Sequence, residues 1–456
     1  MVASPTLRRA VTRWEVLGIA VNDVVGSGVY LLPAATAALM GGASLWAILA
    51  AGLAVSLLVL CFAEAASHFD EPGSGYLYTR EAFGPFLAFE VGWMTFLTRV
   101  TTSASLSNGF AQALGFLWPG ATSGGGRVLV IGGALALFTW INVVGVKTAA
   151  RTAGCLALAK LLPLLLLAGV GIFAIDVRHV LAGSTPSGEG LGQAVLLILF
   201  AYAGFENSAA VAGECRNPRR DIPMALITMI AGVTILYFLI QVVALGALSD
   251  LAEREGGAPL ADAATRLFGR WGGLLLTAGA VVSILGTIGG STLNGPRYLF
   301  AMAQDGFGPR ILASIHPRWR TPWVAIVTQT SIAFVLALSG TFVRLALLSV
   351  IARLAMYIGT AAAVPVLRRK LPRTPDTIVL PGGPTIPIAA LLLCLVFLAS
   401  AEPRNLALGA IALVVGAGIY ALRRTPVATT VGPIEDNKKP PVRRPGASRG
   451  ARNDSA

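Results

Sequence analysis

The chain has 456 residues, of which 55% are hydrophobic and only 12% are charged, and its formal net charge is +13. A soluble protein of this length cannot bury so much apolar surface, so the composition predicts an integral membrane protein. The positive charge does not indicate a nucleic acid partner, because most basic residues fall in short loops and in the C-terminal tail, where they set membrane orientation.

Twelve apolar segments of roughly 20 residues are predicted to cross the membrane as helices. In chain order they cover 16–39, 44–66, 86–114, 128–146, 152–175, 191–213, 222–248, 272–303, 322–338, 342–367, 386–401 and 405–422. A cytoplasmic N-terminus places most of the 35 lysines and arginines inside. We therefore expect a bacterial-type inner or plasma membrane location with both termini cytoplasmic.

Four regions follow from this pattern. Residues 1–15 form a cytoplasmic N-terminus, 16–368 hold the first ten helices, and 369–422 hold the last two. Residues 423–456 are rich in Pro, Arg, Lys, Gly and Ser and lack apolar periodicity, which predicts a disordered basic cytoplasmic tail.

The first span contains the sequence VVGSGVYLLP, in which Gly26 and Gly28 flank Ser27. An unwound backbone at membrane depth is tolerated where it lines a cavity or contacts a ligand. The alternative interpretation is a face of small residues that packs against another helix. This motif alone does not decide between the two.

A second interruption is predicted in the sixth span, where Gly204 precedes Glu206 in an apolar stretch. A carboxylate at that depth is costly unless it is paired or hydrated. Gly26 and Gly204 lie in the first spans of two successive groups of five helices. Interrupted helices in matching positions of two halves point to a transporter built on an inverted repeat.

The two interruptions suggest which chemical groups could bind there. A half-helix that begins near Val29 presents free N–H groups, which suit a carboxylate. Half-helices that end near Val25 and Ala203 present free carbonyl groups, which suit an ammonium. The pair therefore fits the zwitterion of an α-amino acid.

Several motifs resemble those of the amino acid–polyamine–organocation (APC) superfamily of permeases. They include VVGSGVYLLP, EPGSGYLYTREAFGPFLAFEVGW, NVVGVKTAARTAGCLALAKLLPL, FAYAGFENSAAVAGECRNPRRDIPMAL and GPRYLFAMAQDGFGP. The match covers about 14–370. It implies an all-α membrane fold of twelve helices with a five-plus-five inverted repeat (LeuT-like), discontinuous first and sixth helices, and transport by alternating access.

The resemblance also implies a substrate site. The backbone and hydroxyl groups of Gly26, Ser27 and Gly28 would bind the substrate carboxylate. Carbonyl groups near the ends of the two half-helices would bind the ammonium, and Phe200 matches the aromatic residue that closes over the substrate. The full set of expected substrate-binding residues is Val24, Val25, Gly26, Ser27, Gly28, Phe200, Ala201, Ala203 and Gly204.

Three ionisable residues are candidates for coupling. Lys160 in the fifth span either snorkels to the cytoplasmic surface or, as the resemblance implies, replaces a sodium ion, which predicts sodium-independent transport. Asp23 and Glu206 are further candidate proton sites, although each alternatively faces the cytoplasmic vestibule.

Arg99 and Arg353 fall inside predicted spans, where arginines usually pair or face water. One hypothesis is that one of them binds an acidic substrate side chain through its bidentate fork. The favoured interpretation is a structural ion pair with Glu64, Glu90 or Glu206.

The cysteines Cys61, Cys155, Cys215 and Cys394 lack ligand spacing and are expected to fill the core. We expect no metal, no cofactor and no enzymatic activity. The expected partners are an amino acid, protons and membrane lipid, and no oligomeric state is predicted. A neutral amino acid ranks first as substrate, ahead of cationic amino acids or polyamines carried by an antiporter.

Two functions from other classes remain as alternatives: an amino acid sensor with a transporter fold, and a channel.

Overall fold

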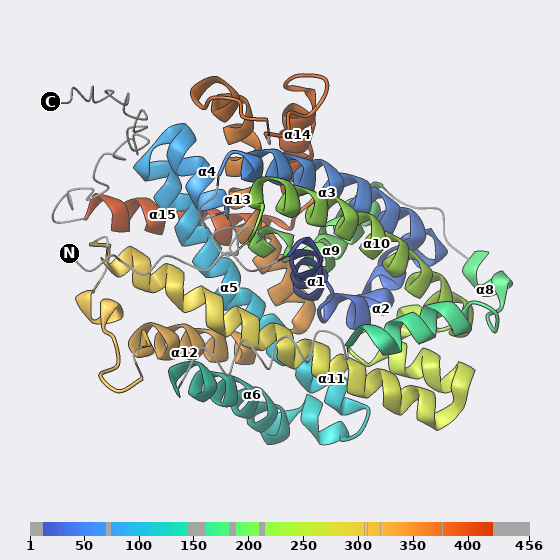
Figure 1. Ribbon diagram of the computed structural model, residues 1–456. Helices are drawn as coiled ribbons and strands as arrows, with labels where there is room; N and C mark the ends of the chain where they lie inside the picture. The colour runs from blue at the N-terminus through green and yellow to red at the C-terminus, as the bar shows by residue number, and fades with distance from the viewer. Residues whose placement is uncertain are drawn as a thin grey trace, which may run out of the picture.

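The computed structural model describes residues 12–69, 74–144, 160–181, 188–208, 215–304, 306, 307, 309–319, 321–375 and 377–422. Its elements are α-helices and short 3-10 turns (Figure 1). The α-helices are α1 (Arg13–Val24), α2 (Gly28–Met40), α3 (Ser44–Ser67), α4 (Ser74–Phe83), α5 (Pro85–Gly115), α6 (Gly124–Val144), α8 (Val177–Leu181), α9 (Gly188–Tyr202), α10 (Pro218–Ala247), α11 (Pro259–Gln304), α12 (Trp323–Ser339), α13 (Phe342–Lys370), α14 (Thr385–Ala399) and α15 (Pro403–Ala421).

Short 3-10 turns lie between α-helices, among them η1 (Gly41–Ala43), η2 (Pro119–Thr122), η4 (Leu251–Arg254) and η5 (Arg310–Ala313). A further apolar helix covers Lys160–Gly171. The predicted tail at 423–456, the start of the fifth span and the end of the sixth span lie outside the described residues.

Among the described residues, seven helical runs are long and apolar enough to cross a membrane; the longest is α11, and another continues from α2 through η1 into α3. Three shorter apolar helices accompany them: Lys160–Gly171, α12 and α14. The 31-residue α5 spans about 46 Å at the α-helical rise but carries Glu90 and Arg99 and many small polar residues. Length and apolar composition together make the chain an integral membrane protein.

The helices separate into a buried centre and an apolar periphery. Helix α5 packs along α11 and α13, while α3 lies against α10 (Figure 1). Large apolar side chains are exposed on outer helices, among them Trp140 on α6 (64%), Val335 on α12 (65%) and Val414 on α15 (72%). Such exposure is expected of surfaces that face lipid, because lipid tails are as apolar as these side chains.

The interruption expected at Gly26 is present. Helix α1 ends at Val24, Val25 has the non-helical angles φ −74° and ψ 89°, and α2 begins at Gly28. A second interruption follows α9, where Gly204 has φ +126° and a single 3-10 turn covers 205–208. A positive φ of this size strongly favours glycine, which explains the residue type at this position.

Candidate binding site at two helix breaks

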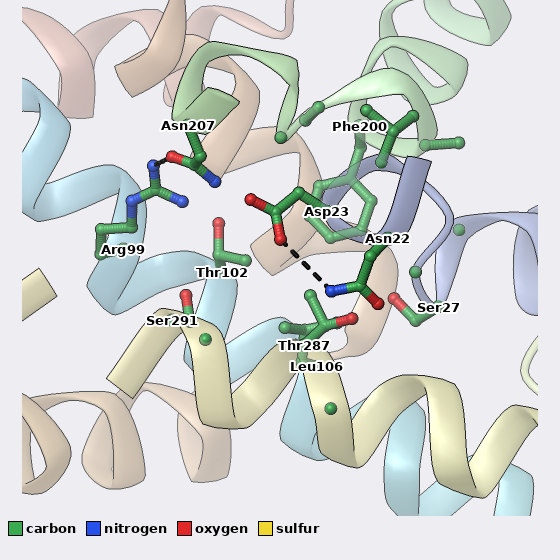
Figure 2. A pocket seen from close by; sticks show the side chains of 18 of the residues that line it. Asn22, Asp23, Ser27, Arg99, Thr102, Leu106, Phe200, Asn207, Thr287 and Ser291 are labelled. Atoms are coloured by element: carbon green, nitrogen blue, oxygen red, sulfur yellow. Dashed lines mark hydrogen bonds between the residues drawn. The ribbon is translucent and has the colours of Figure 1, made fainter. Parts of the chain in front are cut away.

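The two interrupted helices enclose a cavity of about 80 Å³. Side chains from five parts of the chain face it (Figure 2). Its lining residues are Asn22, Asp23, Val24, Gly26, Ser27, Gly28, Arg99, Thr102, Leu106, Phe200, Ala201, Ala203, Gly204, Asn207, Gly286, Thr287, Gly290, Ser291, Asn294 and Arg353.

Most of the residues singled out from the sequence lie around this one cavity. Of the expected substrate-binding set, all but Val25 line it, and so do Asp23, Arg99 and Arg353. Val25 is fully buried, and its carbonyl oxygen lies 3.3 Å from the Ser283 hydroxyl, which donates to it. Lys160 and Glu206 are buried behind the lining residues.

The start of α2 presents hydrogen-bond donors at the cavity. Ser27 precedes the helix, and its backbone carbonyl accepts from both Tyr30 and Leu31 at 3.1 Å. The first N–H groups of a helix, here those of Gly28 and Val29, have no partner inside it. The Ser27 hydroxyl is 1% exposed and has no hydrogen-bond partner in the described part of the chain. A positive helix end and an unused hydroxyl therefore meet at the cavity wall.

The carbonyl groups at the end of α1 are bound by side chains from three other helices. The Lys160 ammonium donates to the Asn22 carbonyl, and the Tyr237 hydroxyl lies 3.2 Å from that of Val24. Ser283 donates to the Val25 carbonyl, so three carbonyl groups at the end of α1 accept hydrogen bonds from side chains. The unwound backbone therefore satisfies the requirement for hydrogen bonding at membrane depth. Lys160 does not snorkel to the surface, because the residue is only 1% exposed.

The two breaks contact each other directly. A Cβ atom at Gly28 would lie 2.7 Å from the Cα and Cβ atoms of Ala201. A Cβ atom at Gly204 would collide with the backbone of Asp23. Each break therefore has a glycine at the point where it contacts the other interrupted helix. A larger residue at either position would prevent this close approach.

Glu206 holds a buried charge cluster next to the cavity. One carboxylate oxygen accepts from Arg353 and lies 3.9 Å from Arg99. The other accepts from the Gly204 amide at 3.0 Å and from the Tyr357 hydroxyl at 3.4 Å. The structural ion pair favoured from the sequence is therefore present, with Glu206 as the partner of Arg353.

The two other carboxylates considered from the sequence do not join this cluster. Glu64 pairs with Arg368, and one of its oxygens accepts from the Leu380 amide at 3.0 Å. Glu90 is buried, and neither of its oxygens has a hydrogen-bond partner among the residues described. Its neighbours include Gly416 of α15.

Sequence reasoning missed about half of the lining residues, most of them polar or glycine. Thr102 comes from a run of small polar residues in α5, TTSASLSNG, and Ser291 and Asn294 come from GTIGGSTLNG in α11. Both runs interrupt otherwise apolar helices. Such runs of small polar residues in the sequence would have identified the helix faces that line the cavity. Asn207 directly follows Glu206 at the second break.

No group of three or more His, Cys, Asp or Glu side chains suited to a metal ion occurs in the part of the chain that the structure describes. Cys61 and Cys394 are buried as free thiols, which is the environment expected of cysteines that fill a core.

A family model described as amino acid permease matches residues 11–421. The chain belongs to the amino acid permease family. This confirms the APC resemblance and makes the protein a transporter rather than an enzyme.

Three bacterial relatives illustrate the family's range. The permease is 31% identical over 386 residues to the serine/threonine exchanger SteT of Bacillus subtilis, covering 82% of this chain and 87% of SteT. It is 27% identical over 411 residues to the branched-chain amino acid permease BcaP of the same organism, covering 86% and 87%. It is also 27% identical over 416 residues to the methylthioribose transporter of B. subtilis, covering 87% and 89%.

Proposed function

We propose that this permease is a secondary transporter that moves an amino acid by alternating access. Transport is sodium-independent and runs either with a proton or in exchange for a second amino acid. The name of SteT as an exchanger supports the second mode. The three relatives differ in the solutes that their names give, so the relatives alone do not identify the side chain of the substrate.

One observation carries the proposal. The Ser27 hydroxyl is buried at the N-terminal end of α2, where it lines the cavity and has no partner among the residues that the structure describes. A carboxylate there accepts from the serine and from the free N–H groups of Gly28 and Val29, and the helix dipole favours its charge. The α-ammonium then lies against carbonyl groups at the end of α9, near Phe200 and Ala203. Phe200 covers the substrate from the side.

The proposal includes the architecture that such a cycle uses. We infer twelve spans, with helices one to five and six to ten forming an inverted repeat and the last two helices outside it. Both termini are cytoplasmic. The direct contacts between the two breaks support this arrangement, because substrate sites in inverted-repeat transporters lie where the interrupted helices of the two halves meet.

Lys160 provides the argument for sodium independence. Its ammonium donates to the Asn22 carbonyl, at the helix end whose partial negative charge attracts cations. A resident cation at this place replaces an ion that would otherwise bind with each cycle. Asp23, which lines the cavity, and Glu206 are the proposed proton sites if transport runs by symport.

Counterflow in proteoliposomes tests the proposal. Vesicles loaded with one unlabelled amino acid are diluted into the same labelled amino acid, across a panel of common amino acids and polyamines. We expect labelled amino acid to accumulate transiently at the same rate in sodium or choline buffer. A sensor or a channel gives no accelerated exchange, a polyamine antiporter responds only to polyamines, and a rate that collapses in choline contradicts sodium independence.

A further inference from the structure

This inference rests on the proposed function and names the substrate class of the same site. The charges around the cavity comprise three basic residues, Arg99, Lys160 and Arg353, and two acidic residues, Asp23 and Glu206. Arg353 pairs directly with Glu206, and Lys160 interacts electrostatically with Asp23. Arg99 shares Glu206 with Arg353 at 3.9 Å and also interacts electrostatically with Asp23, so three basic groups are balanced by only two carboxylates.

The contacts of Arg99 show how incompletely it is neutralised. One terminal nitrogen donates to the Asn207 side-chain oxygen, a neutral acceptor. The same nitrogen lies 3.9 Å from Glu206, whose oxygens are already occupied by Arg353, the Gly204 amide and Tyr357. The Nε atom of Arg99 is buried without a partner among the described residues. A buried guanidinium whose nearest carboxylate is shared with a second arginine is only partly neutralised, which is costly.

Arg99 also stands where a substrate side chain would reach it. Figure 2 shows Ser27 on one side of the cavity and Arg99 on the other, with Asp23, Thr102, Asn207 and Ser291 around the intervening space. The second terminal nitrogen of Arg99 points toward that space. The Ser291 hydroxyl is buried and has no partner within the described ranges. A solute whose α-carboxylate sits at Ser27 therefore extends its side chain toward Arg99.

We propose that Arg99 and Ser291 bind the side-chain carboxylate of an acidic amino acid, so that the substrate class is the dicarboxylic amino acids. A side-chain carboxylate supplies a third negative charge to balance the three basic groups and accepts from the unused Ser291 hydroxyl. The paired geometry of guanidinium and carboxylate makes such contacts strong and selective. Cationic amino acids and polyamines bring a further positive charge toward Arg99 and are excluded. This differs from the neutral substrate favoured by the sequence.

The test compares acids with their near-isosteric amides in wild-type protein. Proteoliposomes are assayed for counterflow of labelled L-aspartate, L-glutamate and L-serine, with unlabelled L-asparagine and L-glutamine as competitors. A hydrogen-bonded charge pair predicts that each acid competes about ten- to a hundredfold better than its amide. Equal competition by acid and amide overturns the inference. No counterflow of any amino acid instead contradicts the proposed function itself.

Two variants attribute the selectivity to Arg99. In Arg99→Gln we expect the preference for acids over amides to disappear, so that each acid and its amide compete about equally. Arg99→Lys keeps the positive charge but cannot bind a carboxylate with two parallel hydrogen bonds, so we expect it to retain part of the preference for acids over amides. The matched control is Arg297→Gln, which removes a partly buried arginine of α11 that donates to its own helix and does not line the cavity. An Arg99→Gln protein that still prefers acids to amides contradicts the assignment, and the wild-type comparison stands if this variant does not fold.

Discussion

The hydroxyl group of Tyr237 lies 2.9 Å from the carbonyl oxygen of Ala201, which places a side chain of α10 on the last turn of α9. The same hydroxyl is 3.2 Å from the carbonyl of Val24, at the end of α1. A tyrosine has a single O–H donor, so the two broken helices share one hydrogen atom between them. Tyr237 thereby links the two breaks at a position where neither can move without changing this bond.

Removal of that hydroxyl should weaken the link. In Tyr237→Phe we expect the free energy of unfolding to fall by about 1 kcal/mol, the net contribution of one hydrogen bond, and the counterflow rate to fall several-fold. Tyr202→Phe is the control, because it removes a bond between the same two helices, to the Thr234 hydroxyl at 3.1 Å, that does not involve the carbonyl of Val24 or Ala201. Equal counterflow rates in the two variants would show that Tyr237 has no special role.

Ser27→Ala tests the proposed carboxylate contact. The hydroxyl has no protein partner in the described structure, so its loss should leave thermal stability unchanged. A lost hydrogen bond to a charged group should raise the substrate concentration for half-maximal counterflow about tenfold or more. Ser56→Ala serves as control, since Ser56 only bonds the Gly52 carbonyl of its own helix at 2.7 Å. An unchanged affinity in Ser27→Ala would remove Ser27 from the site.

Lys160→Gln tests the resident cation. Removal of the ammonium leaves the end of α1 and the Asp23 carboxylate without their positive neighbour, so we expect the initial counterflow rate to fall at least about tenfold, as for loss of a charged hydrogen bond. Lys370→Gln is the matched control, because Lys370 also donates to a backbone carbonyl, that of Ala82 at 2.9 Å, far from the cavity. Full activity in Lys160→Gln disproves the coupling role.

The Glu64–Arg368 pair should contribute to stability rather than to binding. Glu64 is fully buried, and breaking a buried pair typically costs about 3–5 kcal/mol. We expect Glu64→Gln to lower thermal stability strongly while the substrate affinity of the remaining folded protein stays the same. The exposed pair Arg80–Glu81, at 3.2 Å, provides the control Glu81→Gln, for which a change below about 1 kcal/mol is expected. Similar losses in both variants contradict this prediction.

The sequence located the breaks because glycine in an apolar helix is a local signal. Gly26, Gly28 and Gly204 are visible without any knowledge of neighbours. The partners of the breaks are not, because Tyr237 and Ser283 reach them from helices that are distant in the chain. Nothing near these two residues in sequence distinguishes them from ordinary polar residues of a membrane helix.

The charges show the same limit. Composition revealed that Arg99 and Arg353 lie inside spans, but a choice among three carboxylates required the packing of α5 and α13 around the second break. Only the geometry shows that Arg353 donates directly to Glu206, whereas Arg99 donates to the Asn207 carboxamide and lies 3.9 Å from Glu206. The boundaries of the fifth and sixth spans are not tested, since parts of both lie outside the described residues.

Gly290 offers the most direct test that the substrate occupies this cavity. Gly290 lines it, and a Cβ atom there would meet no atom within 4 Å, so a larger side chain fills cavity space without disturbing packing. Gly232 of α10 is equally open but does not line the cavity. The measurement is equilibrium binding of labelled L-glutamate and L-serine to purified wild-type, Gly290→Val and Gly232→Val proteins. We predict saturable binding of at least one ligand in the wild-type and Gly232→Val proteins and none in Gly290→Val, whereas wild-type affinity in folded Gly290→Val would contradict the account.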